Sequence, residues 1–119
     1  MKVYKKLEDS YEDIHGACID TLKDYEKIGF TAKQSILRYI EDFDGAYEEY
    51  ELEWQLMMIS LGVFAVENNS IDDLYLYRIK NAIFELKINS FEDSLSRDDI
   101  LLLNKHIEFL NKALNKKIR

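Results

Sequence analysis

The residues of this chain whose chemistry and positions in the sequence could serve catalysis or metal binding are its two histidines and Glu12. Glu12 and His15 form a Glu-x-x-His pair, whose side chains share one face of a helix and which is half of the ligand set of di-iron helical bundles. The second half needs a Glu three residues before His106, where Leu103 stands. Neither histidine lies beside a Ser or Cys in the pattern of an activated nucleophile. We therefore expect no catalytic residue, no metal ligand and no cofactor, with Glu12 and His15 on a solvated helix surface and His106 at a boundary or the surface.

A second group of residues indicates binding to another protein. The acidic segment, residues 41–53, contains seven carboxylates and neither Lys nor Arg. Its acidic residues are Glu41, Asp42, Asp44, Glu48, Glu49, Glu51 and Glu53. Because seven carboxylates equal the formal net charge of -7, the negative field of the molecule is concentrated in this segment. A local field of this kind speeds the encounter with a basic partner and disfavours acidic ones.

The acidic segment also contains aromatic residues that a binding surface can use as anchors. Tyr47, Tyr50 and Trp54 fall on one helical stripe, and binding energy concentrates on aromatic residues surrounded by polar ones. The alternative is a solvated face whose acids favour the N-terminus of a helix. Glu49 and Glu53, four residues apart, repel each other by roughly 0.2–0.5 kcal/mol, with no basic residue nearby in sequence. Stability alone does not account for this pattern, so we predict that the segment binds a partner.

Apolar periodicity predicts that about five helices position these residues in one all-α bundle. The predicted helices run from near Val3 to Lys27, from Ala32 to about Phe43, from about Ala46 to Asn68, from Ile71 to about Ile88, and from just after Ser96 to about Lys116. Gly29 has the place of a C-terminal cap, Thr31 with Gln34 forms a capping box, and Asp44-Gly45 marks a bend. Two further helix starts are marked by Ser70 with Asp73 and by Ser96 with Asp99.

The apolar stripes of these helices predict the core. They comprise Tyr4, Leu7, Tyr11, Ile14, Cys18 and Leu22; Ile36, Leu37, Tyr39 and Ile40; and Ile100, Leu103, Ile107, Leu110 and Leu114. The helix over 46–68 has apolar residues on every side of its second half, so it should be central, with Gly62 permitting a close crossing. The helix over 71–88 has a second apolar side, formed by Leu74, Tyr77, Phe84 and Ile88.

Composition fits one cytoplasmic helical domain. A chain of 119 residues with 47% hydrophobic residues suits one globular unit, and zero Pro with four Gly leaves few of the residues that turns and hairpins require. Residues 1–8 lack the apolar core of a signal peptide, and the apolar run over 54–66 is too short to span a bilayer. The single cysteine, Cys18, fits a reducing compartment. The overall acidity opposes nucleic-acid binding.

The segment over 41–69 also resembles a known class of proteins. With Glu51-Leu52-Glu53-Trp54 leading into a central apolar helix, followed by Glu67-Asn68-Asn69, the chain is similar to the small helical immunity proteins of bacterial polymorphic toxin and contact-dependent inhibition systems. It differs from the immunity proteins of nuclease colicins, because it has no Pro and no adjacent Tyr-Tyr pair. The resemblance implies a non-enzymatic inhibitor that binds a cognate toxin, often a nuclease, and occludes its active site or a nearby surface.

The resemblance and the charge pattern lead to one primary hypothesis and one alternative. In the first, the seven carboxylates of the acidic segment, with Tyr47, Tyr50 or Trp54 where exposed, bind the basic groove of a toxin. In the alternative, the chain is a structural or regulatory helical module that self-associates through the second apolar side of the helix over 71–88. We expect a monomer or a homodimer, with neither a membrane nor a nucleic acid as partner.

Overall fold

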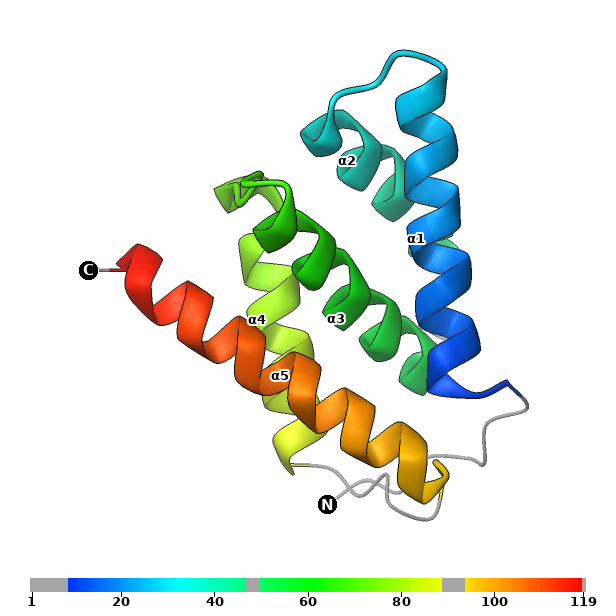
Figure 1. The fold of residues 1–119 in the computed structure, drawn as a ribbon, viewed down its shortest axis with the longest axis vertical. Helices are drawn as coiled ribbons and strands as arrows, with labels where there is room; N and C mark the ends of the chain where they lie inside the picture. Colours follow the sequence, from blue (N-terminus) through cyan, green and yellow to red (C-terminus); the bar gives the residue numbers. More distant parts are fainter. Residues whose placement is uncertain (1–8, 47–49, 89–93, 119) are drawn as a thin grey trace.

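Five α-helices and one short 3₁₀ turn make up the computed structural model, which describes residues 9–46, 50–88 and 94–118 (Figure 1). The elements are α1 (Tyr11–Lys27), α2 (Ala32–Phe43), η1 (Asp44–Ala46), α3 (Glu51–Glu67), α4 (Asp73–Ile88) and α5 (Arg97–Ile118). These ranges contain no β-strand, so the predicted all-α class is confirmed. None of the described helices combines the length and the apolar character needed to cross a membrane.

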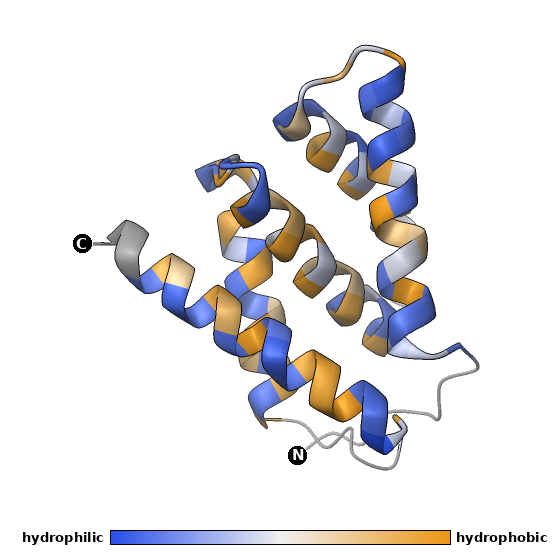
Figure 2. Ribbon diagram, in the orientation of Figure 1, coloured by the Kyte–Doolittle hydropathy of each residue, from blue (hydrophilic) through white to orange (hydrophobic). Residues whose placement is uncertain are grey.

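Helix α3 is the centre of the bundle and packs against each of the four other helices. Twelve of its 17 residues are buried, so it has no solvent-facing stripe over most of its length. Figure 2 shows apolar residues along most of α3, whereas polar and apolar residues alternate around α1. A helix that is apolar on all sides is stable only when other helices surround it, which explains why α3 takes the central place. The prediction of a central third helix is confirmed.

The outer helices contribute one apolar stripe each to the core around α3. The buried members of the predicted stripes are Tyr11, Ile14, Cys18 and Leu22 of α1, Ile36, Tyr39 and Ile40 of α2, and Leu103, Leu110 and Leu114 of α5. Leu37, Ile100 and Ile107 pack against this core while partly exposed. Cys18 is buried, and burial raises the pKa of its thiol to about 12, so the thiol stays protonated and behaves as a small apolar group.

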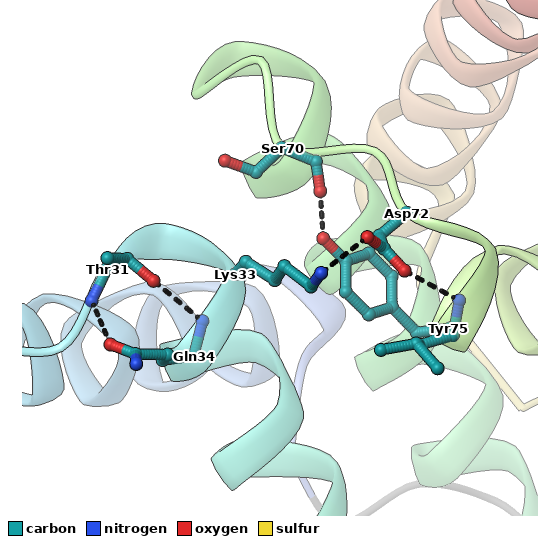
Figure 3. Close-up of polar contacts among 7 residues, drawn as sticks. Thr31, Lys33, Gln34, Ser70, Asp72 and Tyr75 are labelled. Carbon is teal, nitrogen blue, oxygen red and sulfur yellow. Dashed lines mark hydrogen bonds and ion pairs between the residues drawn. The ribbon is translucent and has the colours of Figure 1, made fainter.

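The connection between α1 and α2 follows the local signals in the sequence. Gly29 has φ +104°, a left-handed conformation that glycine adopts without a steric penalty, and it ends α1 as expected. At the start of α2, the Gln34 amide N–H donates to Thr31 Oγ1 at 3.1 Å, and the Thr31 N–H donates to Gln34 Oε1 at 2.9 Å (Figure 3). The capping box is therefore confirmed, and α2 begins and ends as predicted.

The starts of three helices, α1, α3 and α4, differ from the prediction. Helix α1 begins at Tyr11 and not near Val3, because Ser10 is extended and its Oγ accepts a hydrogen bond from the Asp13 N–H at 3.1 Å. Residues 1–8, including Tyr4 and Leu7 of the predicted stripe, lie outside the described residues. Helix α3 begins at Glu51 and not near Ala46; Tyr50 is non-helical, and the carboxylates of Glu51 and Glu53 then lie in the first turn, where the helix dipole favours them.

Helix α4 begins at Asp73 and is capped by Asp72, not by Ser70 as predicted. The Asp72 Oδ1 accepts a hydrogen bond from the Leu74 N–H at 2.9 Å, and Asp72 Oδ2 lies 2.7 Å from Lys33 Nζ of α2 (Figure 3). Ser70 instead donates its hydroxyl to the Asn68 carbonyl and accepts at its own carbonyl from the hydroxyl of Tyr75. One carboxylate thus caps α4 and ties it to α2. The predicted Ser96 cap of α5 is confirmed, since Ser96 Oγ accepts from the Asp99 N–H at 3.2 Å.

Candidate partner-binding site

The described acids of the acidic segment lie on three consecutive elements. Glu41 and Asp42 occupy the last turn of α2 and are exposed, and Asp44 is exposed in η1. Glu51 and Glu53 are partly exposed in the first turn of α3. Tyr47, Glu48 and Glu49, which we also predicted to bind the partner, lie outside the described residues. The structure therefore places five of the seven predicted carboxylates around the turn from α2 to α3, with at least part of each side chain accessible.

Folding brings basic residues to two of these acids, although the segment itself contains none. Arg38 Nε donates to Asp42 Oδ2 at 3.2 Å from one turn earlier in α2, and Arg78 Nη1 of α4 lies 3.3 Å from Asp44 Oδ1. Asp42 Oδ2 also accepts from the Tyr25 hydroxyl at 2.7 Å. Burial, aided by Asp42, raises the pKa of Tyr25 to about 12, so this hydroxyl keeps its proton as a donor. These contacts fix the directions of Asp42 and Asp44 without burying either carboxylate.

The two described aromatic residues of the predicted site lie in different environments. Tyr50 is 52% exposed and is available at the surface, whereas Trp54 is only 5% exposed and belongs mainly to the core. Trp54 nevertheless lines a hollow whose other lining residues come from η1, α3 and α4. They are Asp44, Gly45, Gln55, Tyr77, Arg78 and Asn81. The sequence predicts Tyr77 on the second apolar side of the helix over 71–88, and the tertiary structure also places it beside the acidic segment, because Tyr77 and Asp44 line the same hollow.

Gln55 is a polar residue of the hollow that the sequence analysis missed. Its side chain is 1% exposed, and its Nε2 is buried without a hydrogen-bond acceptor in the described part of the chain. An unsatisfied buried donor costs about 1–3 kcal/mol, and it forms a favourable contact with any acceptor that reaches it. The sequence signal for Gln55 is its position as a polar residue within the largely apolar run 52–61. The hollow therefore combines an exposed carboxylate, a guanidinium, aromatic rings and a buried amide donor that no described residue satisfies.

The two histidines, 91 residues apart in sequence, meet at the junction of α1, α3 and α5. Their ring centroids are 4.6 Å apart, His15 Nδ1 lies 2.9 Å from Ser60 Oγ, and His106 Nδ1 lies 2.6 Å from the Tyr11 hydroxyl. Burial strongly raises the pKa of Tyr11, so its hydroxyl keeps the proton and donates to neutral His106. The predicted boundary position of His106 is confirmed, since its ring is partly buried, whereas the predicted solvated surface position of His15 is wrong, because its ring is partly buried in the same polar cluster.

Both histidines of this cluster favour the neutral form. Burial, with contributions from the neighbouring His15 and Lys105, lowers the pKa of His106 to about 4. Burial also lowers the pKa of His15, against the opposing effect of Glu67. Ser60, the hydroxyl bonded to His15, is fully buried, so a substrate has no direct access to it. The hydrogen bonds Tyr11–His106 and His15–Ser60 link α1 to α5 and α1 to α3, so the cluster has a structural role in joining three helices.

Two further findings bear on the chemistry of the whole chain. Among the described residues, no group of three or more His, Cys, Asp or Glu side chains is arranged to hold a metal ion, so Glu12 and His15 belong to no such group. Comparison of the chain with protein-family models, with curated proteins and with solved structures finds no match.

Proposed function

We propose that this chain is a cytoplasmic immunity protein of a bacterial toxin system, which binds a basic toxin through its acidic segment and occludes the toxin's functional surface. The observation that carries the proposal is the concentration of seven carboxylates in thirteen residues, with the described ones accessible around the turn from α2 to α3. A nuclease toxin presents Lys and Arg around its substrate groove, and these groups complement the segment. Blocking a groove requires no catalytic group, which fits a chain without a recognisable nucleophile.

Prior orientation of the carboxylates supports this proposal. Tyr25 and Arg38 hold Asp42, and Arg78 lies beside Asp44, before any partner arrives. Binding then immobilises fewer side chains, and each immobilised rotamer-rich side chain costs about 0.5–1.5 kcal/mol. Glu41, exposed on the last turn of α2, extends the same negative surface. A toxin's Lys or Arg side chains would meet exposed carboxylates, two of which are already held in place by contacts within the chain.

The hollow beside the acidic segment offers a place for an anchoring loop of the toxin. Tyr77, which is 60% exposed and lines the hollow with Asp44, supplies a large apolar contact. A toxin loop would pack its apolar side chains against Tyr77, while basic side chains on either side paired with Asp44 and its neighbours. Electrostatic attraction would set the association rate, and the anchor would set the lifetime of the complex.

The experiment that tests the proposal starts from the partner itself. The tagged chain is used to capture proteins from the cytoplasm of its native host with toxin expression induced, and the captured protein is purified. We expect a stoichiometric basic domain that arrests growth when expressed alone and loses this effect when the present chain is co-expressed. Capture of no such domain, or a captured domain whose toxicity is unchanged by co-expression, contradicts the proposal.

A charge-reversal variant then tests the acidic segment. Replacing Glu48, Glu49 and Glu51 together by Lys is expected to lower the association rate with the captured domain about tenfold, because the local attraction becomes repulsion. The matched control replaces the exposed residues Asp20, Glu26 and Glu108 by Lys, which changes the net charge equally but elsewhere on the surface. Circular dichroism verifies that both variants remain helical. Equal effects of the two variants exclude the acidic segment as the binding surface.

A further inference from the structure

Helix α4 has two apolar stripes, and only one of them is used in the core. Tyr75, Ile79, Ala82 and Leu86 are buried against the bundle. On the opposite side, Leu74, Tyr77, Phe84 and Ile88 are between 46% and 60% exposed, and Asn81 between them is exposed as well. These four are half of the eight large hydrophobic side chains exposed among the described residues. Such a concentration on one helix indicates a surface that another protein covers.

The spacing of this outer stripe is that of a helix in a two-stranded coiled coil. Steps of three, four, three and four residues lead from Leu74 through Tyr77, Asn81 and Phe84 to Ile88. With Leu74 at heptad position a, Tyr77 and Phe84 occupy position d, and Asn81 is a polar residue at a central a position. An Asn at one a position sets the register of parallel helix pairs, where the two amides face each other. The stripe therefore has the pattern of a helix that pairs with its own copy.

All of the facing charges beside the stripe are opposite in the parallel orientation, whereas the antiparallel orientation mixes attraction with repulsion. In a parallel pair, a residue at position g faces the residue five positions later, at position e, on the other helix. Asp73 then faces Arg78 of the second copy, and Lys80 faces Glu85 of the second copy, so both contacts join opposite charges. An antiparallel pair with Asn81 against Phe84 would instead place Lys80 against Lys87, which repel, and Arg78 against Glu85, which attract, and it would bury the Asn81 amide against an aromatic ring.

We propose that a second copy of this chain binds to the outer stripe of α4, forming a parallel α4–α4 pair about a two-fold axis. In Figure 1, α4 lies behind α3 and α5, at one face of the bundle, so two bundles can approach along this face. The four exposed apolar side chains would bury roughly 400 Å² per copy, which with flanking contacts reaches the low end of specific interfaces. Because the interface is small, we expect a weak dimer, with a Kd of roughly micromolar or above. The pair covers one wall of the hollow, because Tyr77 and Asn81 belong to both, so the dimer and a toxin loop in the hollow would exclude each other.

Sedimentation equilibrium of the full chain, up to millimolar concentration, tests whether the dimer exists and where its interface lies. We expect a monomer–dimer equilibrium, and we expect Phe84→Glu to raise the dimer Kd at least tenfold because it places two like charges in the apolar seam. Leu101→Glu is the control, since Leu101 is equally exposed but lies on α5. A wild-type chain that remains monomeric at every concentration overturns the proposal. A dimer that Phe84→Glu leaves intact, or that Leu101→Glu dissociates, overturns it as well.

A charge exchange tests the parallel orientation. Lys80→Glu is expected to raise the dimer Kd about three- to tenfold, because the new carboxylate would face Glu85 of the second copy, and the symmetric pair contains this contact twice. The double variant Lys80→Glu with Glu85→Lys restores opposite charges and should return the Kd to within about twofold of the original. If the helices were antiparallel, Lys80→Glu would tighten the dimer, and that result overturns the proposed register. None of these outcomes depends on whether the acidic segment binds a toxin.

Discussion

At the residue scale, the polar cluster of the two histidines shows how a partly buried ionisable group is kept neutral. The Tyr11 hydroxyl can donate to His106 only while His106 Nδ1 lacks a proton, and burial of both groups favours that arrangement. The nearby ring of His15 adds to the cost of a positive charge on His106. Protonation of His106 therefore removes a hydrogen bond and introduces a poorly solvated cation at the junction of three helices.

The lowered pKa of His106 predicts that the protein loses stability as the pH falls from about 6.5 toward 4. In the unfolded chain His106 takes up a proton near pH 6.5, whereas in the folded chain it does so only near pH 4. Acid therefore favours unfolding across this window. The full shift in the pKa of His106 would lower the free energy of unfolding by about 2 kcal/mol between pH 7 and pH 5. Because the ring is partly exposed, the expected loss is about 1 kcal/mol. Urea unfolding followed by circular dichroism at several pH values measures it.

A variant separates the histidine from the carboxylates that also titrate in acid. His106→Gln keeps an acceptor for the Tyr11 hydroxyl but does not titrate, so its stability should fall less steeply between pH 7 and pH 5. Parallel pH profiles for the variant and the wild-type chain would show that His106 is not the group responsible.

At the element scale, the approach of α4 and α5 to α3 depends on Gly62. A Cβ atom at this position would lie 2.9 Å from Ile79 Cγ2 and 3.0 Å from Leu110 Cδ2, closer than carbon atoms normally pack. Leu110 can move the end of its side chain, but the branched Ile79 has little freedom because α4 holds it in the core. The close crossing predicted at Gly62 is therefore confirmed, and its two neighbours are identified.

Two glycine-to-alanine substitutions are expected to change stability in opposite directions. Gly62→Ala should lower the free energy of unfolding by about 1–2 kcal/mol, because overpacking outweighs the gain in helix propensity. Gly16→Ala, in the exposed part of α1 with no atom within 4 Å of the added Cβ, should raise it by about 0.5–1 kcal/mol. Denaturant titration compares the two variants. Stabilisation of the chain by Gly62→Ala would show that the crossing has room for a methyl group.

At the scale of the whole molecule, charge is divided unequally along the chain. Residues 29–69 carry eight acidic and two basic side chains, whereas residues 95–119 carry three acidic and six basic ones. The principal extents of 39 × 33 × 24 Å are several times the screening length in physiological salt, so each region acts mainly on the charges nearest to it. The Debye length at physiological ionic strength is about 8 Å, and the acidic region therefore acts mainly on partners that are already near it.

This charge distribution predicts a salt-dependent association with the basic toxin domain. Raising the NaCl concentration from about 50 to 500 mM should slow association roughly tenfold while the dissociation rate changes little, because salt screens long-range attraction more than close contacts. Stopped-flow fluorescence measures both rates. An association rate that does not vary with salt would exclude electrostatic steering by the acidic segment.

The sequence alone determined the fold class, the central helix and most of the core, because these depend on local signals and on periodicity. The Thr31–Gln34 capping box and the glycine at residue 29 act within a few residues, so they are readable without tertiary structure. A helix apolar on all sides likewise has only one stable place, at the centre of a bundle. Helix starts were predicted less well, because several neighbouring residues can serve as the N-terminal cap. The structure shows that Ser10 caps α1 and Asp72 caps α4.

Only the tertiary structure decided which distant residues meet. His15 and His106 come together because α1 and α5 pack side by side, and no periodicity within either helix indicates that contact. In the same way, Arg78 reaches Asp44 across 34 positions, and Tyr77 joins the hollow beside the acidic segment. Local sequence specifies the face that each helix buries, but the polar contacts between helices depend on the angles and distances at which those faces pack.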